Sequence, residues 1–439
     1  MRNVGSIFTA SGALRLPARV TFFVQNRCLA TPADALGRRR VPMLIFCYIC
    51  GLKIETSPMA IDISKVPSPC YVLDEQLLRN NLRLIDRVRR ESGAEIIMAF
   101  KAFAFWPSFS IFRECGFDCA TASSLSEAML ARHELGQPAH TYSPAYTDAE
   151  FDAICQCSSH ITFNSLSQYE RFAPRARAAG HAISLGLRIN PESSDVATAL
   201  YNPCAPGSRM GITAANMPAE LPADIEGLHF HALCESDSTD LQKTLGAVEQ
   251  RFARWLPKVR WVNMGGGHLM TRKGYDTDLL VRLIRDFARR WDVRVILEPG
   301  SAFTWQTGVL VSDVEDVVEN GGISTAIVNV SFAAHMPDCL EMPYKPRIAG
   351  AHHDPVDGLP TYRIGGNSCL SGDYIGSWSF DRPLRVGDKI VFEDMIHYTV
   401  VKTTMFNGLT HPSLAIWDDA KGLRVVRTFG YDDYRSRLG

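Results

Sequence analysis

Short apolar runs alternate with longer stretches of helical spacing through the middle of the chain. After Asp74, a favourable helix N-cap residue, apolar side chains recur three and four positions apart at Leu78, Leu82 and Ile85. Further helical stretches are expected at 124–135, 167–179, 241–256 and 278–290. The apolar runs predict eight strands, at 95–100, 117–120, 140–143, 160–163, 184–189, 226–231, 260–264 and 294–297. Eight strands alternating with helices predict a (β/α)8 barrel of the TIM type, an α/β fold.

The pattern changes after residue 300, where helical periodicity largely disappears. Strands are expected at 308–318, 324–332, 389–393, 398–403 and 423–429, separated by turns such as Glu319-Asn-Gly-Gly. We therefore expect a barrel over 75–299 and an all-β C-terminal domain over 300–439. Residues 59–74 would supply an N-terminal strand, near Cys70, that joins the β domain.

Residues 1–58 differ in charge from the rest of the chain. They carry seven arginines and almost no acidic residues, and their one apolar run, 41–52, is short for a bilayer span. An arginine-rich, acid-poor segment is typical of a transit peptide. Our interpretation is instead a poorly packed extension ahead of a start at Met59.

Composition narrows the class of protein. The formal net charge of -1, with 21% charged residues, offers no basic excess for a nucleic-acid or membrane partner. Cys115/Cys119 and Cys155/Cys157, among 12 cysteines, lack a second pair at zinc-finger spacing, so no metal is expected from spacing. Reduced thiols in a cytoplasmic enzyme are the simplest interpretation.

Lys101 follows the first predicted barrel strand in an apolar setting that includes Phe100, Phe103 and Phe105. Desolvation disfavours the ammonium form, and a free amine can bond covalently to an aldehyde cofactor. The alternative is a lysine whose stem leaves a core strand and whose charge reaches solvent.

Polar residues recur at the C-terminal ends of the predicted strands, where barrels carry their chemistry. Each alone has a structural explanation, such as a helix cap or a core histidine. Gly265-Gly-Gly267 could approach a phosphate or form a plain loop, and Glu298 could face a protonated pyridine nitrogen or a nearby arginine. Together with Lys101 they describe a pyridoxal phosphate site. The full set is Lys101, Asp118, Asn164, Arg188, Asn190, His229, His231, Gly265, Gly266, Gly267 and Glu298.

Several motifs resemble a known family, the fold-type III pyridoxal-phosphate decarboxylases, whose members include ornithine and diaminopimelate decarboxylases and share the alanine racemase-like barrel. The resemblance runs from about residue 67 to 430. It rests on Met98-Ala-Phe-Lys101, Gly227-Leu-His-Phe-His231, Gly265-Gly-Gly267, Glu298-Pro-Gly300, Cys369-Leu-Ser-Gly-Asp373 and Tyr398-Thr-Val. Within the family, 228–235 and 369–373 are most similar to the carboxynorspermidine/carboxyspermidine branch of bacterial polyamine enzymes.

The resemblance implies a role for each site residue. Lys101 would hold pyridoxal 5'-phosphate covalently, Cys369 would return a proton to Cα, and Asp338 would receive the distal amine of the substrate. Ser301 stands where ornithine and diaminopimelate decarboxylases carry Arg, so the phosphate site lacks one guanidinium. The other implied cofactor contacts are Asp118, Arg188, His231, Gly265, Gly266, Gly267, Glu298 and Tyr398, and the other implied substrate contacts are Glu298, Asp373 and Glu235.

The implied activity is decarboxylation of carboxynorspermidine or carboxyspermidine in polyamine biosynthesis. The implied assembly is a homodimer in which Cys369 and Asp373 reach the partner's site. Two alternatives stay open. One is a decarboxylase of ornithine or diaminopimelate, and the other is a non-catalytic regulatory relative, which the presence of both Lys101 and Cys369 disfavours.

Overall fold

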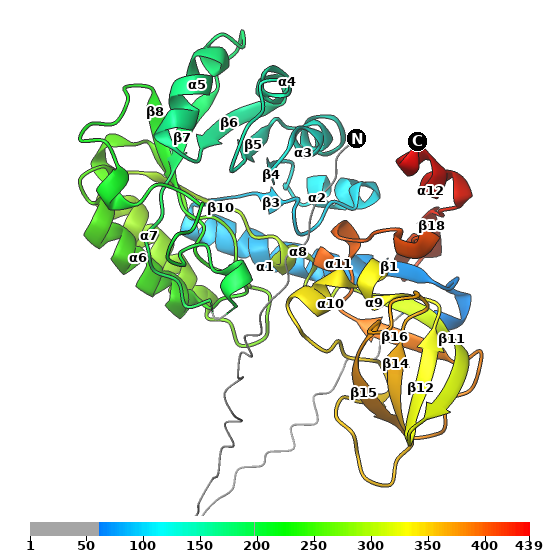
Figure 1. Cartoon of the computed structure of the whole chain (residues 1–439). Coiled ribbons are helices and arrows are strands. Elements are labelled where there is room, and N and C mark those ends of the chain that lie inside the picture. Colours follow the sequence, from blue (N-terminus) through cyan, green and yellow to red (C-terminus); the bar gives the residue numbers. More distant parts are fainter. Residues whose placement is uncertain (1–60, 197) are drawn as a thin grey trace, which may run out of the picture. The chain divides into compact units, whose positions relative to one another are not determined.

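The computed structural model describes residues 61–196 and 198–439, which contain two sheets (Figure 1). In the first sheet every neighbouring pair is parallel, in the order β2-β10-β9-β8-β7-β6-β5-β4-β3. Its strands are β2 (Glu95–Ile96), β3 (Met98–Ala99), β4 (Ala120–Ala122), β5 (Ala139–Tyr142), β6 (Ser158–Phe163), β7 (Ser184–Arg188), β8 (Ile225–His229), β9 (Trp261–Asn263) and β10 (Arg294–Leu297).

The two short pieces β2 and β3 form one strand that closes the ring. The Ile97 N–H donates to the Leu297 carbonyl of β10 (3.0 Å), and the Met98 N–H donates to the Cys119 carbonyl beside β4 (3.2 Å). The first strand thus bonds to the last strand on one side and to the second strand on the other. The predicted eight-stranded barrel is confirmed.

The second strand was predicted at 117–120, which is about three residues before the strand in the structure. The structure begins β4 at Ala120, while Phe117 caps the turn after α2 (Phe109–Glu114) by donating to the Phe112 carbonyl (3.0 Å). The Phe117 ring packs edge-on against Phe303, 5.2 Å between centroids, on the outer side of the barrel. Its apolar character therefore serves the packing of the helices and not the strand.

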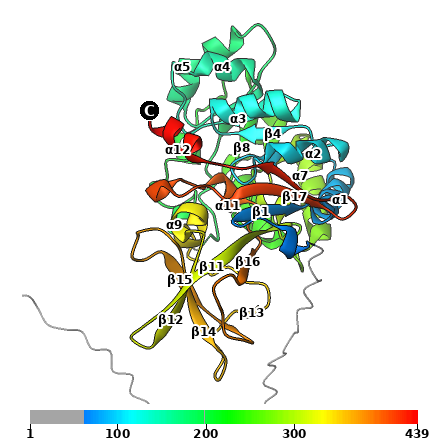
Figure 2. The same cartoon turned by 90° about the vertical axis from the view of Figure 1, so that its right-hand side faces the viewer.

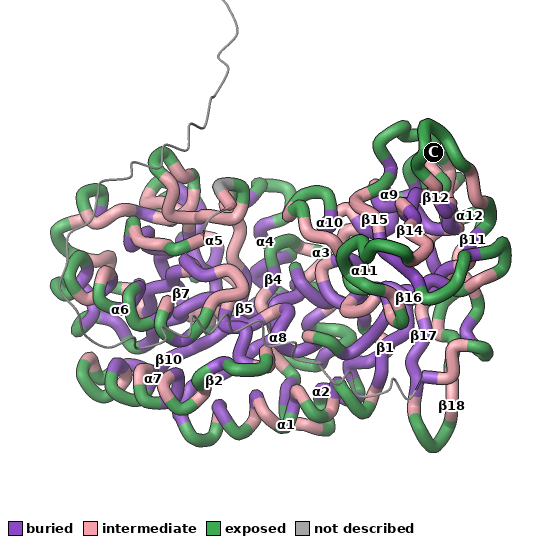
Figure 3. Tube along the Cα trace, turned by 90° about the horizontal axis from the view of Figure 1, so that it is seen from below, coloured by how far each residue is buried: buried purple, intermediate pink, exposed green. Residues whose placement is uncertain are grey.

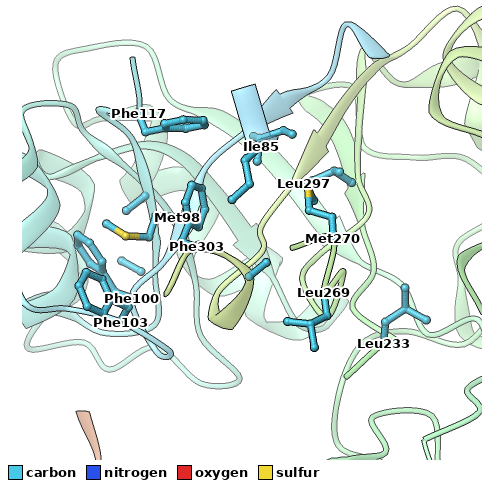
Figure 4. Packing of buried hydrophobic residues seen from close by; sticks show 14 of the residues in the cluster. Ile85, Met98, Phe100, Phe103, Phe117, Leu233, Leu269, Met270, Leu297 and Phe303 are labelled. Carbon is cyan, nitrogen blue, oxygen red and sulfur yellow. The ribbon is translucent and has the colours of Figure 1, made fainter. Parts of the chain in front are cut away.

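Helices cover the outside of the barrel, and apolar residues fill the layer between (Figure 4). Helix α1 (Glu75–Ser92) starts where predicted, because the Asp74 side chain accepts from the Leu77 N–H (2.9 Å). Ile85 of α1, Met98 and Leu297 belong to the same buried cluster as Phe303. The other covering helices include α3 (Leu125–Leu130), α4 (Phe151–Gln156), α5 (Leu166–Arg177), α6 (Ser238–Phe252) and α7 (Thr277–Trp291).

A tryptophan fills the middle of the barrel. Trp261 is 2% exposed and packs with Ile97 and Ile296. A Cβ on Gly227 would lie 2.0 Å from its Cδ2 atom, and one on Gly186 would lie 2.4 Å from its Cη2 atom, so the indole occupies the space those glycines leave. The Trp261 Nε1–H donates to Ser184 Oγ (2.9 Å). This apolar layer separates the two ends of the barrel interior.

The second sheet is mixed and includes the N-terminal strand. Strand β1 (Cys70–Asp74) pairs antiparallel with β11 (Gly308–Asn320) and parallel with β17 (Ser413–Asp418), and Figure 2 shows β1 and β17 side by side. Its path is β13-β15-β14-β12-β11-β1-β17-β18, with β16 on β11. The remaining bounds are β12 (Ile323–Val328), β13 (Ala351–His352), β14 (Thr361–Gly365), β15 (Tyr374–Phe380), β16 (Lys389–Glu393) and β18 (Gly422–Arg427).

The expectation of an all-β second half was wrong in part. The predicted strand at 398–403 is the short helix α11 (Tyr398–Val401), where Thr399 is buried and donates to Asp338 Oδ2 (2.9 Å). Four further helices lie among residues 300–439, α8 (Ser301–Thr304), α9 (Phe332–His335), α10 (Pro337–Glu341) and α12 (Tyr431–Leu438). The β-branched residues of 398–401 therefore form a helix, in which the side chain of Thr399 is hydrogen-bonded to Asp338.

Buried trace follows the barrel strands and β1, while exposed trace follows the outer faces of the helices (Figure 3). Within the described ranges, no helix is long and apolar enough to cross a membrane. The interpretation of 1–58 as an extension, with a start at Met59, lies outside the described residues.

Candidate active site

Lys101 lies just past β3, at the C-terminal end of the barrel strands. Solvent reaches its side chain, yet protein groups surround it, and Phe100, Phe103 and Phe105 are buried beneath the loop. Burial, followed by the charge of Arg188, lowers the pKa of the Lys101 amine. Lys101 is itself exposed and its side-chain partner is the His231 ring, and its lowered pKa favours a nucleophilic free amine.

His231 presents a defined face to that amine. The Gly266 N–H donates to His231 Nδ1 (2.8 Å), and His231 Nε2 lies 3.3 Å from Lys101 Nζ. Burial, followed by Lys101 and Arg188, holds the pKa of His231 well below its usual value, so the ring is neutral. A neutral ring that accepts at Nδ1 carries its proton on Nε2, which then points at the Lys101 lone pair.

Glu298 is a buried, ionised carboxylate next to this pair. Burial opposes its charge, but His229 and hydrogen bonds from Asn263 and Thr121 outweigh burial and lower the Glu298 pKa. The Asn263 side chain donates to Oε1 (2.6 Å), and His229 Nε2 lies 3.5 Å from Oε2. Burial lowers the pKa of His229, and the Glu298 carboxylate opposes that shift.

Arg188, at the end of β7, adds the positive charge. Its guanidinium lies 4.6 Å over the Tyr142 ring and donates to the His231 carbonyl (3.3 Å). Arg188 is 3% exposed, and its Nε has no hydrogen-bond partner among the described residues. Tyr142 in turn donates to Asn164 Oδ1 (2.7 Å), so one polar layer spans the barrel above Trp261.

The glycine triplet differs from its expected role as an anion nest. The N–H groups of Gly265 and Gly266 already donate to Asn263 Oδ1 and His231 Nδ1, both at 2.8 Å. Gly265 and Gly267 have φ of +70° and +89°, and a Cβ on Gly267 would lie 2.3 Å from the Leu233 backbone. Two of the three glycines thus position the site through the protein. The N–H of Gly267 remains available to bind an anion. The short helix α8 (Ser301–Thr304) follows β10, and barrels often bind phosphate at this place.

Asp118 is not part of this end of the barrel. Because β4 begins at Ala120, Asp118 precedes the strand and lies at the N-terminal end, exposed and bonded to Gln137 (3.3 Å). The structure therefore contradicts both expectations for Asp118, its place at the C-terminal end of a strand and the cofactor contact that the resemblance implied.

A second group of acids lies where the loop after β8 meets α10 and α11. Asp338 Oδ2 accepts from Tyr344 (2.7 Å) and Thr399 (2.9 Å), while Oδ1 is buried without a hydrogen-bond partner in the described part of the chain. Glu235 has φ of +48°, a conformation that is costly outside glycine, and burial raises its pKa. An unpaired buried carboxylate oxygen is suited to a cation.

His397 and Tyr398 lie beside these acids. Burial opposes a charged His397, but Asp394, 3.4 Å from its Nε2, and then Asp338 and Glu235 raise the His397 pKa. Burial, followed by the charges of Cys234 and Glu235, raises the pKa of Tyr398. Tyr398 thus lies near Glu235, and it stays a proton donor at neutral pH.

The 369–373 motif splits into two different environments. Cys369 is exposed, and its N–H donates to Asn407 Oδ1 (2.9 Å). Asp373 is 4% exposed and accepts from Ser368 Oγ (2.7 Å) and the Ala333 N–H (2.9 Å). The Asp373 carboxylate therefore holds its own loop against α9. Its predicted contact with substrate stays a prediction.

The sequence interpretation missed Asn263 and His397. Asn263 shares a strand face with Trp261 and orients both Glu298 and Gly265. The alternation of side chains along β9 places Asn263 on the same inward face as Trp261, and this pattern would have identified it. His397 carries no such signal, because its acidic neighbours come from distant segments.

The residues that meet at this end fit pyridoxal phosphate. A low-pKa amine, an ionised buried carboxylate, a neutral planar ring and the loops after β9 and β10 match, respectively, its aldehyde, ring nitrogen, ring face and phosphate.

Comparisons with known proteins agree with this fit. The family described as "Pyridoxal-dependent decarboxylase, C-terminal sheet domain" matches residues 47–396. Carboxyaminopropylagmatine decarboxylase of Synechocystis sp. is 50% identical over 86% of this chain and 97% of its own length. Carboxynorspermidine/carboxyspermidine decarboxylase of Campylobacter jejuni is 42% identical over 85% of this chain and 99% of its own.

Solved structures agree as well. Carboxynorspermidine decarboxylase from Campylobacter jejuni, complexed with norspermidine, matches with a TM-score of 0.78 and 40% identity over 85% of this chain and 100% of its own. The geometry around Lys101 and these likenesses have one common explanation: this chain belongs to the pyridoxal-dependent decarboxylases of the alanine racemase-like fold, enzymes that use pyridoxal phosphate to remove a carboxyl group.

Proposed function

We propose that the protein decarboxylates a carboxylated polyamine, carboxyspermidine or carboxynorspermidine, to spermidine or norspermidine. The observation that carries the proposal is the acid group of Glu235 and Asp338, beside the Lys101 site, with a buried unpaired oxygen at Asp338. A polyamine arm is a chain of cations, and each ammonium is stabilised by a buried carboxylate. The Campylobacter relatives act on this class of compound.

Bound pyridoxal phosphate would supply the electron sink for loss of carbon dioxide. The Lys101 amine would hold the cofactor and yield its place to the amino group of the substrate. His231 would stack on the ring with its Nε2–H directed to the Lys101 side, and Glu298 would keep the ring nitrogen protonated. Arg188 would fix the His231 backbone, and Gly267 with α8 and Tyr398 would hold the phosphate.

Glu235 and Asp338 would bind the distal cations of the arm. Cys369 would return a proton to Cα after the carboxyl group leaves, because a thiol at this position is a competent acid. In one chain Cys369 lies on the surface. We therefore place it in the site of a second copy, so that the working unit is a homodimer in the cytoplasm.

A second candidate substrate is carboxyaminopropylagmatine. The Synechocystis relative, at 50% identity over 97% of its length, acts on this compound. Its agmatine end carries a planar guanidinium, which prefers a two-oxygen carboxylate contact to the single oxygen that an ammonium needs. Asp338 offers one free oxygen, since Tyr344 and Thr399 use the other, and this favours the ammonium substrates.

The test is steady-state kinetics of the holoenzyme on five compounds, with release of carbon dioxide and amine product both measured. The compounds are carboxyspermidine, carboxynorspermidine, carboxyaminopropylagmatine, ornithine and diaminopimelate. We expect the highest kcat/KM on the first two. A higher kcat/KM on the guanidinium compound would select the second candidate, and a preference for ornithine or diaminopimelate would overturn the proposal.

A further inference from the structure

The opposite, N-terminal end of the barrel interior holds a cluster of residues that are not part of the Lys101 site. Glu95 starts β2, Cys119 precedes β4, and His140 lies in β5. One carboxylate oxygen, the sulfur and one ring nitrogen of these residues all lie within 4.8 Å of one another. The layer formed by Trp261 separates this cluster from the catalytic end.

His140 is the residue whose environment calls for a ligand. It is 6% exposed, and no hydrogen bond to its ring is found within the described ranges. Glu95 Oε1 lies 3.6 Å from its Nε2, which is too long for a hydrogen bond. Burial, followed by His160 and Arg294, holds the His140 pKa well below its usual value. A neutral buried imidazole without a partner retains a lone pair for a metal ion.

Arg294 supplies the positive charge that now faces the cluster. The Arg294 Nε atom lies 3.7 Å from Glu95 Oε2, and its Nη2 atom lies 3.2 Å from His160 Nε2. The Arg294 side chain is 51% exposed, so it is able to move into solvent. A cavity of about 320 Å³ is lined by His160 and Arg294, the two residues that contact His140 and Glu95.

We propose that Glu95, Cys119 and His140 bind a zinc ion, with Arg294 as its competitor in the metal-free protein. Thiolate, imidazole and carboxylate together are a ligand set that suits Zn²⁺. The fourth position falls to water or to His160, whose ring centroid is 3.8 Å from that of His140. The competing explanation is an ion-pair network of Glu95, His140 and Arg294 that only ties β2, β5 and β10 together.

Binding releases one proton. Burial, followed by the charges of Glu95 and Asp118, raises the pKa of Cys119 to about 12, so the free thiol is protonated and contacts the Pro138 carbonyl at 3.7 Å. Zn²⁺ replaces that proton to form a zinc–sulfur bond, and the charges of thiolate and carboxylate balance the ion. The affinity for zinc therefore rises with pH.

The first test is metal binding by the tag-free holoenzyme, measured by competition with a chromophoric zinc chelator and by the spectrum with Co²⁺. Wild type should bind one ion with a thiolate-to-cobalt absorption band. Cys119→Ser should lose that band, and His140→Gln should bind zinc at least about 100-fold more weakly, since even supporting residues cost 10–100-fold. Cys115→Ser, a nearby cysteine outside the cluster, is the matched control and should bind like wild type.

Arg294→Gln separates the two explanations even where a ligand variant fails to fold. It removes the competitor, so zinc should bind more tightly than to wild type. In an ion-pair network the same variant would only lower stability. A wild type without the thiolate band, a Cys119→Ser variant that retains it, or an Arg294→Gln variant with unchanged zinc affinity would each overturn the proposal.

Discussion

The proton positions of Lys101 and His231 are set by a backbone group. Because Gly266 donates to Nδ1, His231 offers a donor to Lys101 and not an acceptor. An ammonium at Lys101 would face a ring proton, whereas an amine would accept it. The geometry and the low pKa of Lys101 thus favour the same reactive form.

We expect Lys101→Ala to lose both turnover and the visible absorbance of the lysine-bound cofactor. No other amine would be placed beside His231 to hold the aldehyde. Absorbance spectra after dialysis, with decarboxylation assays, measure this. Lys258→Ala, at a surface ion pair with Glu220, is the control and should keep both properties. A dialysed alanine variant that retains the band would show that another lysine holds the cofactor.

Asp338→Asn should raise KM for the polyamine substrate by about 10–100-fold with a smaller change in kcat. The free oxygen at Asp338 would contact a remote ammonium, and a charge-assisted hydrogen bond contributes about 1.5–3 kcal/mol. Asp373→Asn is the informative comparison, since Asp373 holds its own loop and should lower melting temperature instead. An unchanged KM in Asp338→Asn would remove this residue from the substrate site.

At the level of the elements, the alternation of apolar and polar residues predicted the barrel because buried parallel strands and amphipathic helices have distinct periods. The second strand was misplaced because Phe117 is apolar for a different reason, its contact with Phe303. The placement of Asp118 at the C-terminal end of a strand was wrong as a consequence. The motif around Asp373 did not reveal that its carboxylate would accept hydrogen bonds from Ala333 and Ser368, because Ala333 is distant in the sequence.

The cluster at the N-terminal end shows a further limit of sequence spacing. Glu95, Cys119 and His140 come from three separate strands, each about 20 residues from the next, which is the repeat of a barrel and not of a zinc finger. Spacing along the chain argued against a metal, whereas register around the ring brings the three ligand atoms together.

Gly227→Ala should destabilise the protein by about 1–3 kcal/mol or more, the usual range for an overpacked core. The added Cβ would lie 2.0 Å from Trp261, whose rigid indole is buried on both faces. Urea unfolding measures the change. Gly246→Ala in α6, where a Cβ meets no atom within 4 Å, should be neutral or stabilising. Equal unfolding midpoints for the two variants would show that the Trp261 layer yields easily.

For the molecule as a whole, buried neutral histidines predict acid sensitivity. Burial lowers the pKa of both His268 and His335 to about 4. In the unfolded chain these rings take up protons near pH 6.5, so their contribution to the free energy of unfolding should be constant above pH 6.5 and decrease as pH falls from 6.5 to about 4. The slope should be about 1.4 kcal/mol per pH unit for each histidine.

Urea unfolding at several pH values measures this slope. His335→Gln should unfold with a shallower pH dependence than wild type between pH 6.5 and 4. His133→Gln, at an exposed position, is the control and should follow wild type. Parallel curves for His335→Gln and wild type would contradict the assignment of a buried neutral ring.

Shared sites would make mixed dimers informative. If Lys101 and Cys369 act from different copies, then an inactive Lys101→Ala chain and an inactive Cys369→Ala chain should complement each other. Random pairing would restore up to about a quarter of the sites, because half of the dimers are mixed and each has one intact site. Activity measured after unfolding and refolding the mixture tests this, and mixtures as inactive as either parent would refute a shared site.

The Trp261 layer closes the barrel interior, so the catalytic end is open on one side only. If the proposed substrate binds between Glu235 and Asp338, it cannot continue through the barrel past the Trp261 layer, so carbon dioxide, the product amine and the next substrate would all use the same opening. The slowest release step would then limit the rate of turnover. A compound bound between those acids would block substrate entry and product release together without contacting the cofactor. A smaller residue in place of Trp261 would open a second route through the barrel.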